Sequence, residues 1–447
     1  MKFSIDLNIL EQQPGLNKLY TQICSIFPIS DASSHPKIVE TLQNGLERLS
    51  ARFPWLAGQI INQGAGPSSS GTYKIIPFEK TPRLIVKDLS DDPSAPSMEG
   101  LRRANFPFTM VDESIIAPRN TLTLPGTPDE SSPAPILLVQ ANFISGGLIL
   151  TVVSQHSAMD MVGHDHIMYL LSKACHNEEF TSEELSIGNC PNRTNIIPLL
   201  DGYIPNFELE NQMAVPAPTI SQPAPPSTWA YFSFSPNSLA TLKSHASSTL
   251  THGYISTDDA LSALLWQSVI RARLPRLDPS LHVKMTRAID IRRFLDIPST
   301  YPALLQNLLY YTSPLQNLVT SPLGLIASQL RESINPPVVK HNLRALATVL
   351  HQSPDKNVVS FTAQIDQGND IMVSSWSKTE CYEHDFNFGL GKPESVRRPR
   401  FDPVEGLVYF MPKRGDGEVV LGVCLRIEDM ERLKGDGEFM RYAEYVG

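Results

Sequence analysis

The sequence contains little cysteine and no excess of positive charge, and both shortages exclude classes of protein. Its 447 residues include only five cysteines, which are odd in number, scattered, and nowhere spaced as Cys-x-x-Cys. Neither a disulfide framework nor a zinc site is therefore indicated. Lysine and arginine number 37 against 46 aspartates and glutamates, which gives a net charge of −9. An acidic chain without a basic run is a poor partner for nucleic acid or an anionic membrane surface.

Long hydrophobic runs are also missing. The first residues contain no uninterrupted apolar core of the kind found in signal peptides. The longest apolar stretch, residues 136–153, is interrupted by Gln140, Asn142, Ser145 and the pair Gly146-Gly147. This pattern predicts two strands joined by a turn and not a membrane span. We therefore expect a cytoplasmic protein that acts as a monomer on small molecules.

Several familiar catalytic signatures do not occur. The sequence has no Gly-x-Ser-x-Gly elbow, no Walker loop, no Gly-x-Gly-x-x-Gly and no His-Glu-x-x-His. The sequence therefore does not indicate an α/β-type serine hydrolase, a nucleotide-binding fold or a zinc peptidase. The triplet His164-Asp165-His166 lies in a helical pattern, where residues two apart point in different directions. It predicts a polar helix face, and we expect no metal.

What is present is a histidine at a predicted strand-to-helix turn. An apolar run, residues 148–153, leads into His156, and a helical pattern of apolar residues follows it. A histidine in such a turn can act as a general base. Asp160, four residues later, is expected in the first helical turn, where the helix dipole favours a carboxylate. The same spacing recurs at His351 and Asp355, but Pro354 and the lack of a preceding strand make that copy a loop after a helix.

The length of the chain predicts two domains with mixed sheets. Helical spacing predicts a helix over 36–52, and alternation predicts strands at 59–61 and 83–87, with a Gly/Ser hairpin tip at 64–71 between them. A proline-rich crossover follows at 191–228, so the domains are expected at 1–190 and 229–447. Further predicted elements are strands at 229–234, 287–293, 371–376, 406–411 and 419–425, and helices capped by Ser256 and at 323–330 and 338–350.

Motifs in a fixed order connect these segments. His156-x-x-x-Asp160 is followed by Arg287 to Arg293, by Tyr301 to Asn307, and by Ser374-Ser375-Trp376 before Asp385-Phe-Asn-Phe-Gly-Leu-Gly-Lys-Pro393. In order and spacing the chain resembles the BAHD acyltransferase superfamily of plants and fungi. Within it, residues 86–96, 156–163, 256–263 and 390–394 are most similar to the fungal trichothecene 3-O-acetyltransferases.

The resemblance implies a mixed α/β fold with two similar chloramphenicol-acetyltransferase-like domains and a channel between them. It implies acetyl transfer from acetyl-CoA to a hydroxyl of a trichothecene-type sesquiterpenoid, with C-3 expected, and without a metal. His156 would remove the hydroxyl proton, while Asp160 would shape the catalytic site by pairing with Arg292. The remaining assignments are structural support from Asp385, Gly389 and Gly391, and CoA contacts from Ser256, Thr257, Ser374 and Ser375.

Some alternatives remain open on the sequence alone. The C-terminal motif can be aligned to begin at Asp385, with a longer loop, or at Asn387. The acceptor can be another alcohol or an amine. A peptide condensation domain shares the His-x-x-x-Asp spacing but usually has two adjacent histidines, whereas Gln155 precedes His156 here. An inactive relative that keeps the fold is the remaining alternative.

Overall fold

A five-stranded sheet forms the scaffold of the N-terminal half. The computed structural model describes residues 3–123, 132–190, 193–214, 225–250 and 253–447. The strand order is β13-β2-β8-β7-β5, and the bounds are β2 (Tyr20–Pro28), β5 (Arg83–Asp88), β7 (Leu137–Ile144), β8 (Gly147–Gln155) and β13 (Ser395–Arg397). The predicted hairpin over 136–153 is confirmed: β7 and β8 pair antiparallel, and Gly146 adopts a φ of +75° between them. β13 comes from the far end of the chain and pairs antiparallel with β2.

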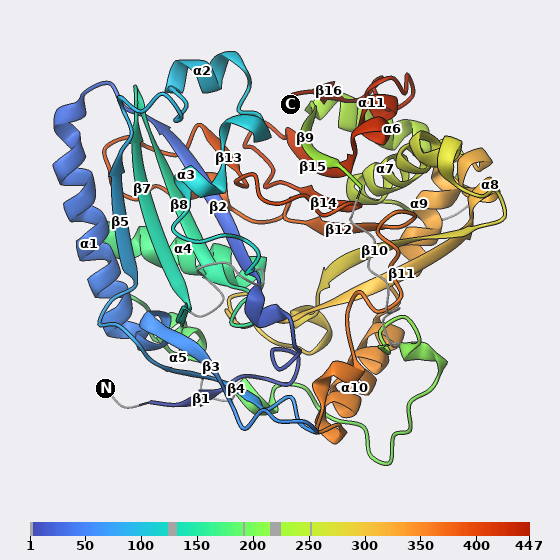
Figure 1. Cartoon of the computed structure of the whole chain (residues 1–447), viewed down its shortest axis with the longest axis horizontal. Helices are drawn as coiled ribbons and strands as arrows, with labels where there is room; N and C mark the ends of the chain where they lie inside the picture. Colours follow the sequence, from blue (N-terminus) through green and yellow to red (C-terminus); the bar gives the residue numbers. More distant parts are fainter. Residues whose placement is uncertain (1–2, 124–131, 191–192, 215–224, 251–252) are drawn as a thin grey trace.

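Two helices cover one face of this sheet (Figure 1). α1 (His35–Arg52) and α4 (Met161–Cys175) bury their apolar faces in one core with β2, β7 and β8. The predicted helix over 36–52 is thereby confirmed. On the opposite face, α2 (Met98–Arg103) packs over Ile26 and Ile149. Because strand side chains alternate between faces, both faces of β8 are apolar and the strand is buried throughout.

A small four-stranded sheet lies beside the first. Its order is β1-β4-β3-β6, with bounds β1 (Ile5–Asp6), β3 (Gly58–Gln63), β4 (Thr72–Pro77) and β6 (Ala134–Pro135). β3 and β4 pair antiparallel from Gly58 opposite Pro77 to Gln63 opposite Thr72, which confirms the hairpin around 64–71. Short helices α3 (Glu113–Ile116) and α5 (Ser182–Gly188) complete this half.

The C-terminal half is built on a seven-stranded mixed sheet in the order β11-β10-β12-β14-β15-β9-β16. Its strands are β9 (Ser227–Phe234), β10 (His282–Asp290), β11 (Gln306–Pro314), β12 (Ile371–Ser375), β14 (Leu407–Phe410), β15 (Val419–Arg426) and β16 (Glu444–Tyr445). Mixed sheets in an α/β chain are what the sequence predicts. The arginine-containing strand β10 is not at the edge of the sheet, because it lies between β11 and β12.

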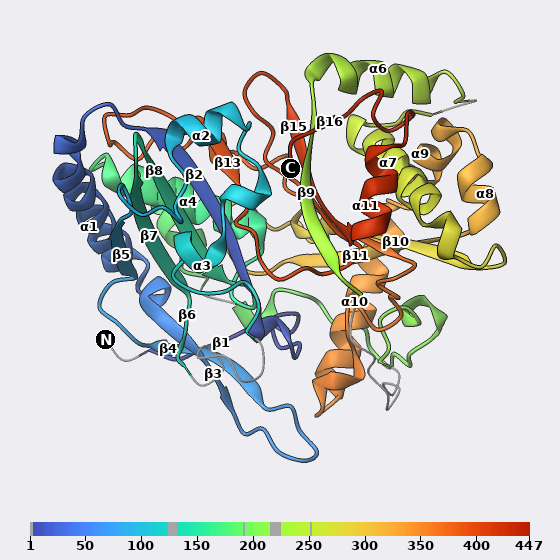
Figure 2. The same cartoon turned by 45° about the horizontal axis from the view of Figure 1, so that its top comes forward.

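The two faces of the seven-stranded sheet have different partners. Ala230, Phe232 and Phe234 on β9 point into a core with the helices, whereas Trp229 and Tyr231 join the core of the N-terminal half. Figures 1 and 2 show the helices gathered on the outer face of this sheet. These helices are α6 (Pro236–Ser247), α7 (Thr257–Arg273), α8 (Leu315–Thr320), α9 (Leu323–Glu332) and α11 (Ile427–Lys434). The inner face therefore meets the first sheet, and their junction is where a channel between the halves is expected.

A third apolar cluster lies at the lower end of this junction. It joins α10 (Pro336–Gln352) to the segment 301–305 and to Ile197 and Leu209 of the crossover. Of the predicted proline-rich crossover, residues 191–192 and 215–224 lie outside the described residues. Among those that are described, no helix is long and apolar enough to cross a membrane.

Candidate functional site

His156 lies in the tight turn between β8 and α4, at the junction of the two halves. Gln155 is the last residue of β8 and pairs with Tyr20 of β2. The His156 backbone N–H then donates to the Leu19 carbonyl at 2.9 Å, and the Gln155 side chain accepts from the Ser157 N–H at 2.7 Å. One hydrogen bond therefore fixes the turn to the residue before β2, and a second, from the Gln155 side chain, closes the turn.

Hydrogen-bond partners define the tautomer of the imidazole. Nδ1 is 3.3 Å from the Met159 carbonyl oxygen and 3.3 Å from Thr21 Oγ1. A carbonyl oxygen can only accept, so Nδ1 carries the proton and Nε2 carries the lone pair. The side-chain amide nitrogen of Gln306 lies 3.3 Å from Nε2, which fits an N–H donated to that lone pair. Thr21, Met159 and Gln306 carry no signal in the sequence that marks them as partners of His156.

Burial keeps this histidine neutral. Removal from water lowers the pKa of His156 to about 4, while the nearby Asp160 carboxylate opposes the shift. The imidazole is thus unprotonated at neutral pH and has the state that a general base requires.

Asp160 is the N-cap of α4 and not a residue of its first turn. Its backbone is extended, with φ −83° and ψ −176°, and its Oδ1 accepts from the Gly163 N–H at 2.9 Å. The sequence therefore placed Asp160 too far into the helix, in its first turn instead of at its N-cap. A capping aspartate still benefits from the helix dipole, because the free N–H groups of the first turn point toward it.

The Asp160 carboxylate is fully occupied by partners other than the histidine. Arg292 donates to both of its oxygens, at 2.9 and 3.0 Å, and the backbone N–H of Leu305 donates at 2.8 Å. With the N–H of Gly163 these make four hydrogen bonds, which is about the capacity of a carboxylate. The predicted buried pair of Asp160 and Arg292 is confirmed, with both side chains almost completely buried.

Arg292 stands outside the strand that the sequence predicted to reach residue 293. β10 ends at Asp290, and a short 3-10 turn, Arg292–Phe294, follows it. From there the guanidinium donates to the carbonyls of Tyr301 and Ala303, at 2.9 and 2.6 Å. The turn is favoured because Asp290 accepts from the Arg292 backbone N–H and side chain.

A second buried ion pair joins the His156 turn to the 301–305 segment. Arg193 contacts Glu11 with Nη2 2.5 Å from Oε1, and the exposed fractions of the side chains are 2% and 0%. Arg193 also donates to the Ala158 carbonyl, while Glu11 accepts from the Leu304 N–H at 3.0 Å. The sequence contains no signal for this pair, whose members are 182 residues apart.

A cavity of about 410 Å³ opens in front of His156. Both halves of the chain line it, which agrees with a channel between them. Residues that share its wall include Tyr20, Thr21, Leu122, His156, Met161, Thr286, Ala288, Gln306, Leu308, Phe361, Met372, Ser374, Trp376, Arg398, Phe401, Leu407 and Tyr409. The lining is mostly aliphatic and aromatic with a few polar groups, as expected for an apolar small molecule.

Arg398 provides a fixed positive charge in this wall. The residue is 2% exposed, its guanidinium lies over the rings of Phe401 and Tyr409, each 4.6 Å from the ring centroid, and it forms no ion pair with any residue in the described ranges. Among the described residues its side chain donates a single hydrogen bond, to Thr121 Oγ1 at 3.4 Å. The cation is thus held mainly by aromatic rings.

The predicted CoA contacts fall in two places. Ser256 caps α7 in a reciprocal capping box with Asp259, as the sequence predicts. Asp259 in turn pairs with Arg287, which points away from the cavity because its strand neighbours Thr286 and Ala288 line it. Ser256 and Thr257 are therefore not brought to His156.

Ser374 and Ser375 lie at the end of β12, and Ser374 lines the cavity. The hydroxyl of Ser374 accepts from the Trp376 indole at 3.0 Å, and Ser375 Oγ is 3.0 Å from Ser377 Oγ. Of the predicted CoA residues, Ser374 is therefore the one that the structure places in the cavity wall, and Ser375 is its neighbour on the strand.

The glycine-rich loop at 385–391 packs against α4 and does not enter the cavity wall. The backbone carbonyl of Asp385 accepts from Ser172 Oγ at 2.6 Å and from His176 Nε2 at 2.8 Å. Gly389 and Gly391 have φ values of +75° and +72°, so the turn needs glycine at both positions. Their predicted supporting role is compatible with this place in the fold.

The expected polar face at 164–166 is wrong for His164. That side chain is completely buried, with Nδ1 2.8 Å from Ser154 Oγ, and burial lowers its pKa to about 3. Asp165 pairs with His384 at 2.8 Å. Within the described ranges no group of three or more histidine, cysteine or acidic side chains is arranged to hold a metal.

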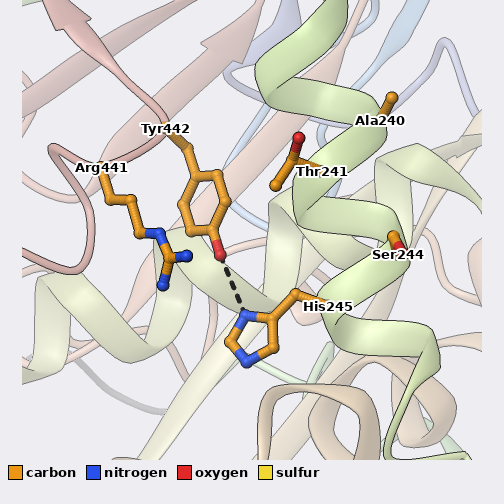
Figure 3. A pocket seen from close by; sticks show the side chains of 6 residues that line it. All are labelled: Ala240, Thr241, Ser244, His245, Arg441 and Tyr442. Atoms are coloured by element: carbon orange, nitrogen blue, oxygen red, sulfur yellow. Dashed lines mark hydrogen bonds between the residues drawn. The ribbon is translucent and has the colours of Figure 1, made fainter.

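A second hollow lies on the outer side of the C-terminal half (Figure 3). It is open to solvent and is lined by residues of α6 and the C-terminal segment, among them Ser244, His245 and Arg441. His245 Nδ1 is 2.9 Å from the Tyr442 hydroxyl. None of the predicted site residues lines it, so the chemistry is assigned to the cavity at His156.

Comparison with known proteins agrees with this arrangement. A family model described as Transferase family matches residues 120–440, and one described as Trichothecene 3-O-acetyltransferase-like N-terminal domain matches residues 19–175. The chain is 52% identical to trichothecene 3-O-acetyltransferase TRI101 of Fusarium sporotrichioides over 449 residues, covering 100% of this chain and 98% of that protein. It is 50% identical to O-acetyltransferase dmxR13 of Cryptosporiopsis sp., covering 100% and 99%.

A solved structure gives the same result for the fold. The crystal structure of Fusarium graminearum TRI101 complexed with coenzyme A and deoxynivalenol superposes with a TM-score of 0.96, at 47% identity and with 100% of both chains covered. The mixed α/β fold expected from the sequence is thereby confirmed. The chain belongs to the Transferase family, the BAHD acyltransferase superfamily that its motifs resemble.

Proposed function

We propose that this protein is an acetyl-CoA-dependent O-acetyltransferase that acetylates a trichothecene-type sesquiterpenoid, at the C-3 hydroxyl. The observation that carries the proposal is the neutral His156, whose Nε2 lone pair is directed into a largely apolar cavity. Full-length similarity to trichothecene 3-O-acetyltransferases supports the same reaction and the same co-substrates.

The reaction follows from the residue types at the site. The acceptor hydroxyl attacks the thioester carbonyl carbon, and His156 Nε2 takes the hydroxyl proton in the same step. The tetrahedral intermediate collapses with cleavage of the C–S bond, and the imidazolium returns the proton to the leaving thiolate. A thioester is already activated, so the sequence of steps uses no metal and no acyl-enzyme.

Asp160 supports this chemistry from a distance. Its four hydrogen bonds leave no acceptor site for the imidazole, and it is the Met159 carbonyl that accepts from Nδ1–H. We therefore assign Asp160 and Arg292 to positioning of the catalytic turn, and proton transfer to His156 alone.

Arg398 favours a neutral hydroxyl over an amine as the acceptor. An aliphatic amine is protonated near neutral pH and would enter a cavity whose wall already contains a buried guanidinium, which has no ion pair with any described residue. Like charges in a low-dielectric site repel strongly. The oxygens of a sesquiterpenoid can instead accept hydrogen bonds from Arg398.

The test is product analysis with purified protein, acetyl-CoA and an acceptor panel. We expect thiol release and a monoacetylated product, by mass spectrometry, with deoxynivalenol-like and isotrichodermol-like alcohols. Acetyl-CoA should be used ahead of longer acyl-CoAs. If no trichothecene is acetylated while a phenol or an amine is acylated rapidly, the acceptor assignment fails and only the acyltransferase assignment remains.

We further propose that the protein works as a cytoplasmic monomer. The described residues of both halves of a single chain line the cavity at His156. All five cysteines are buried free thiols, as a reducing compartment allows. Sedimentation should give a single species near 49.5 kDa.

A further inference from the structure

The side-chain amide of Gln306 lies at the reacting nitrogen of His156. Gln306 is the first residue of β11 and lines the cavity, and its Nε2 is 3.3 Å from the Nε2 of His156. An amide carries two N–H donors, so one can contact the imidazole while the other points elsewhere. The acceptor hydroxyl must approach the same imidazole nitrogen, which puts the developing tetrahedral centre within reach of this amide.

We propose that Gln306 is a catalytic residue that donates an N–H to the oxyanion of the tetrahedral intermediate, and that the two buried ion pairs hold it there. The proposal rests on the acetyltransferase function proposed above. It names a residue for a task that the base cannot perform, since His156 cannot stabilise negative charge on the carbonyl oxygen while it holds the proton for the leaving group.

Binding of the acceptor frees this donor. His156 Nε2 has a single lone pair, so the acceptor hydroxyl displaces the N–H of Gln306 when it hydrogen-bonds to that nitrogen. When the hydroxyl oxygen then bonds to the carbonyl carbon, the carbonyl π electrons move to its oxygen, where the displaced N–H can meet them, and the hydroxyl proton moves to His156 Nε2. On collapse the C=O bond re-forms, the C–S bond breaks, and the proton leaves Nε2 for the thiolate. Departure of the products restores the original contact.

Two clamps set the place of Gln306 relative to His156. The residues immediately before it are held through their backbone N–H groups: Leu305 by Asp160 at 2.8 Å and Leu304 by Glu11 at 3.0 Å. Asp160 closes the His156 turn, and the partner of Glu11, Arg193, binds the Ala158 carbonyl in that turn. Each clamp therefore ties the catalytic turn to the segment before Gln306. Such fixation matters because an oxyanion donor works only when it is already in position.

The opposite orientation of the amide gives the rival explanation. If the Gln306 Oε1 faced His156, the side chain would accept from the protonated Nε2 and stabilise the imidazolium. Glutamate at this position distinguishes the two cases, because it retains the acceptor and removes the donor. A carboxylate there would also raise the pKa of His156.

The experiment compares Gln306→Met and Gln306→Glu with the wild-type protein under saturating acetyl-CoA and acceptor. Both variants should lose about 10²–10³-fold in kcat, as expected when one oxyanion donor is removed. KM values should change less than about threefold, because the interaction is made in the transition state. Wild-type-like kcat in Gln306→Met, or an active Gln306→Glu with its acid limb shifted to higher pH, would overturn the proposal.

Gln212→Met is the matched control. Gln212 donates to Asn307 at 2.8 Å, one residue further along β11, and does not line the cavity. The substitution removes a buried amide of the crossover that contacts the same strand. It should lower Tm similarly while kcat stays within about threefold of wild type, because no transition-state contact is lost. Equal losses of kcat in Gln212→Met and Gln306→Met would show that strand distortion, and not the donor, is responsible.

Two further variants keep the result interpretable. If Gln306→Met fails to fold, Gln306→Asn retains the amide but withdraws it by one methylene, and it should show the same loss of kcat with unchanged KM. Full kcat in Gln306→Asn would count against the donor. His156→Ala in the same assay separates the hypotheses: an active His156→Ala overturns the proposed mechanism as a whole, whereas an inactive His156→Ala beside an active Gln306→Met overturns only the oxyanion assignment.

Discussion

Asp160 and Arg292 are bound to each other by two hydrogen bonds, Oδ2 to Nη1 at 2.9 Å and Oδ1 to Nη2 at 3.0 Å, and neither is bound to His156. The aspartate of the His-x-x-x-Asp motif therefore binds the backbone on either side of His156, at Gly163 and Leu305. It connects the turn of the N-terminal half to the 301–305 segment of the C-terminal half. A motif that resembles a catalytic dyad in sequence is, in three dimensions, the proposed base His156 next to a buried ion pair.

Breaking this pair from one side should be strongly destabilising. Asp160→Ala leaves a buried guanidinium without its carboxylate, which typically costs about 3–5 kcal/mol. Urea unfolding followed by circular dichroism measures the loss. Glu99→Gln is a control, since the pair of Glu99 and Arg103 is 82% and 76% exposed and should contribute only about 0–1 kcal/mol. Similar losses in the two variants would refute a special role for the buried pair.

The pH profile should report a histidine that resists protonation. Because burial lowers the pKa of His156 to about 4, the acid limb of kcat/KM should fall near pH 4 and not near 6.5. The free energy of unfolding should also fall at acid pH. The unfolded chain binds a proton at His156 that the folded site excludes, so the stability present above pH 6.5 is lost as pH falls toward 4. A limb near 6.5 in protein that remains folded would contradict the burial of this group.

Gly163 provides a test of the close approach between the two halves. A Cβ at this position would overlap the carbonyl oxygen of Pro302, a backbone atom that cannot rotate away. Gly163→Ala should therefore displace the 301–305 segment, lower Tm and reduce kcat, with a cost of about 1–3 kcal/mol. Gly66→Ala is the matched control, because nothing lies within 4 Å of a Cβ there. A folded, fully active Gly163→Ala would show that the contact is not required.

The predicted CoA residues can be tested through the KM for acetyl-CoA. We propose that Ser256, Thr257, Ser374 and Ser375 contact CoA, so Thr257→Val and Ser375→Ala should raise this KM with little change in kcat. Ser256→Ala should in addition lose about 1 kcal/mol of stability, because Ser256 caps α7. Ser235→Ala removes the comparable cap of α6 and should leave KM unchanged. An unchanged KM in the first three variants would remove these residues from the CoA site.

Sequence reasoning succeeded where the physical signal is local. Apolar periodicity located α1 and the β7–β8 hairpin, and the capping pattern at Ser256 located the start of α7. It was wrong where tertiary contacts decide, as at His164, whose imidazole is buried against Ser154 although its helix pattern reads as polar. Nothing local marks Glu11 and Arg193 as partners, or Gln306 as a neighbour of His156, because these contacts join distant parts of the chain.

Periodicity cannot predict contacts between residues far apart in the sequence, but the resemblance to a family did predict one. It assigned Arg292 to Asp160 across 132 residues, and the structure confirms that contact. It placed Ser256 and Ser374 together as CoA contacts, whereas only Ser374 lines the cavity at His156.

The most direct test of the account is the turnover of folded His156→Ala with acetyl-CoA and deoxynivalenol, measured as CoA thiol released and monoacetylated product formed. A general base typically contributes about 10²–10⁴-fold, so kcat should fall by that factor while circular dichroism and Tm stay close to those of the wild type. Turnover close to that of the wild type in the folded variant would contradict the assignment of His156 as the base.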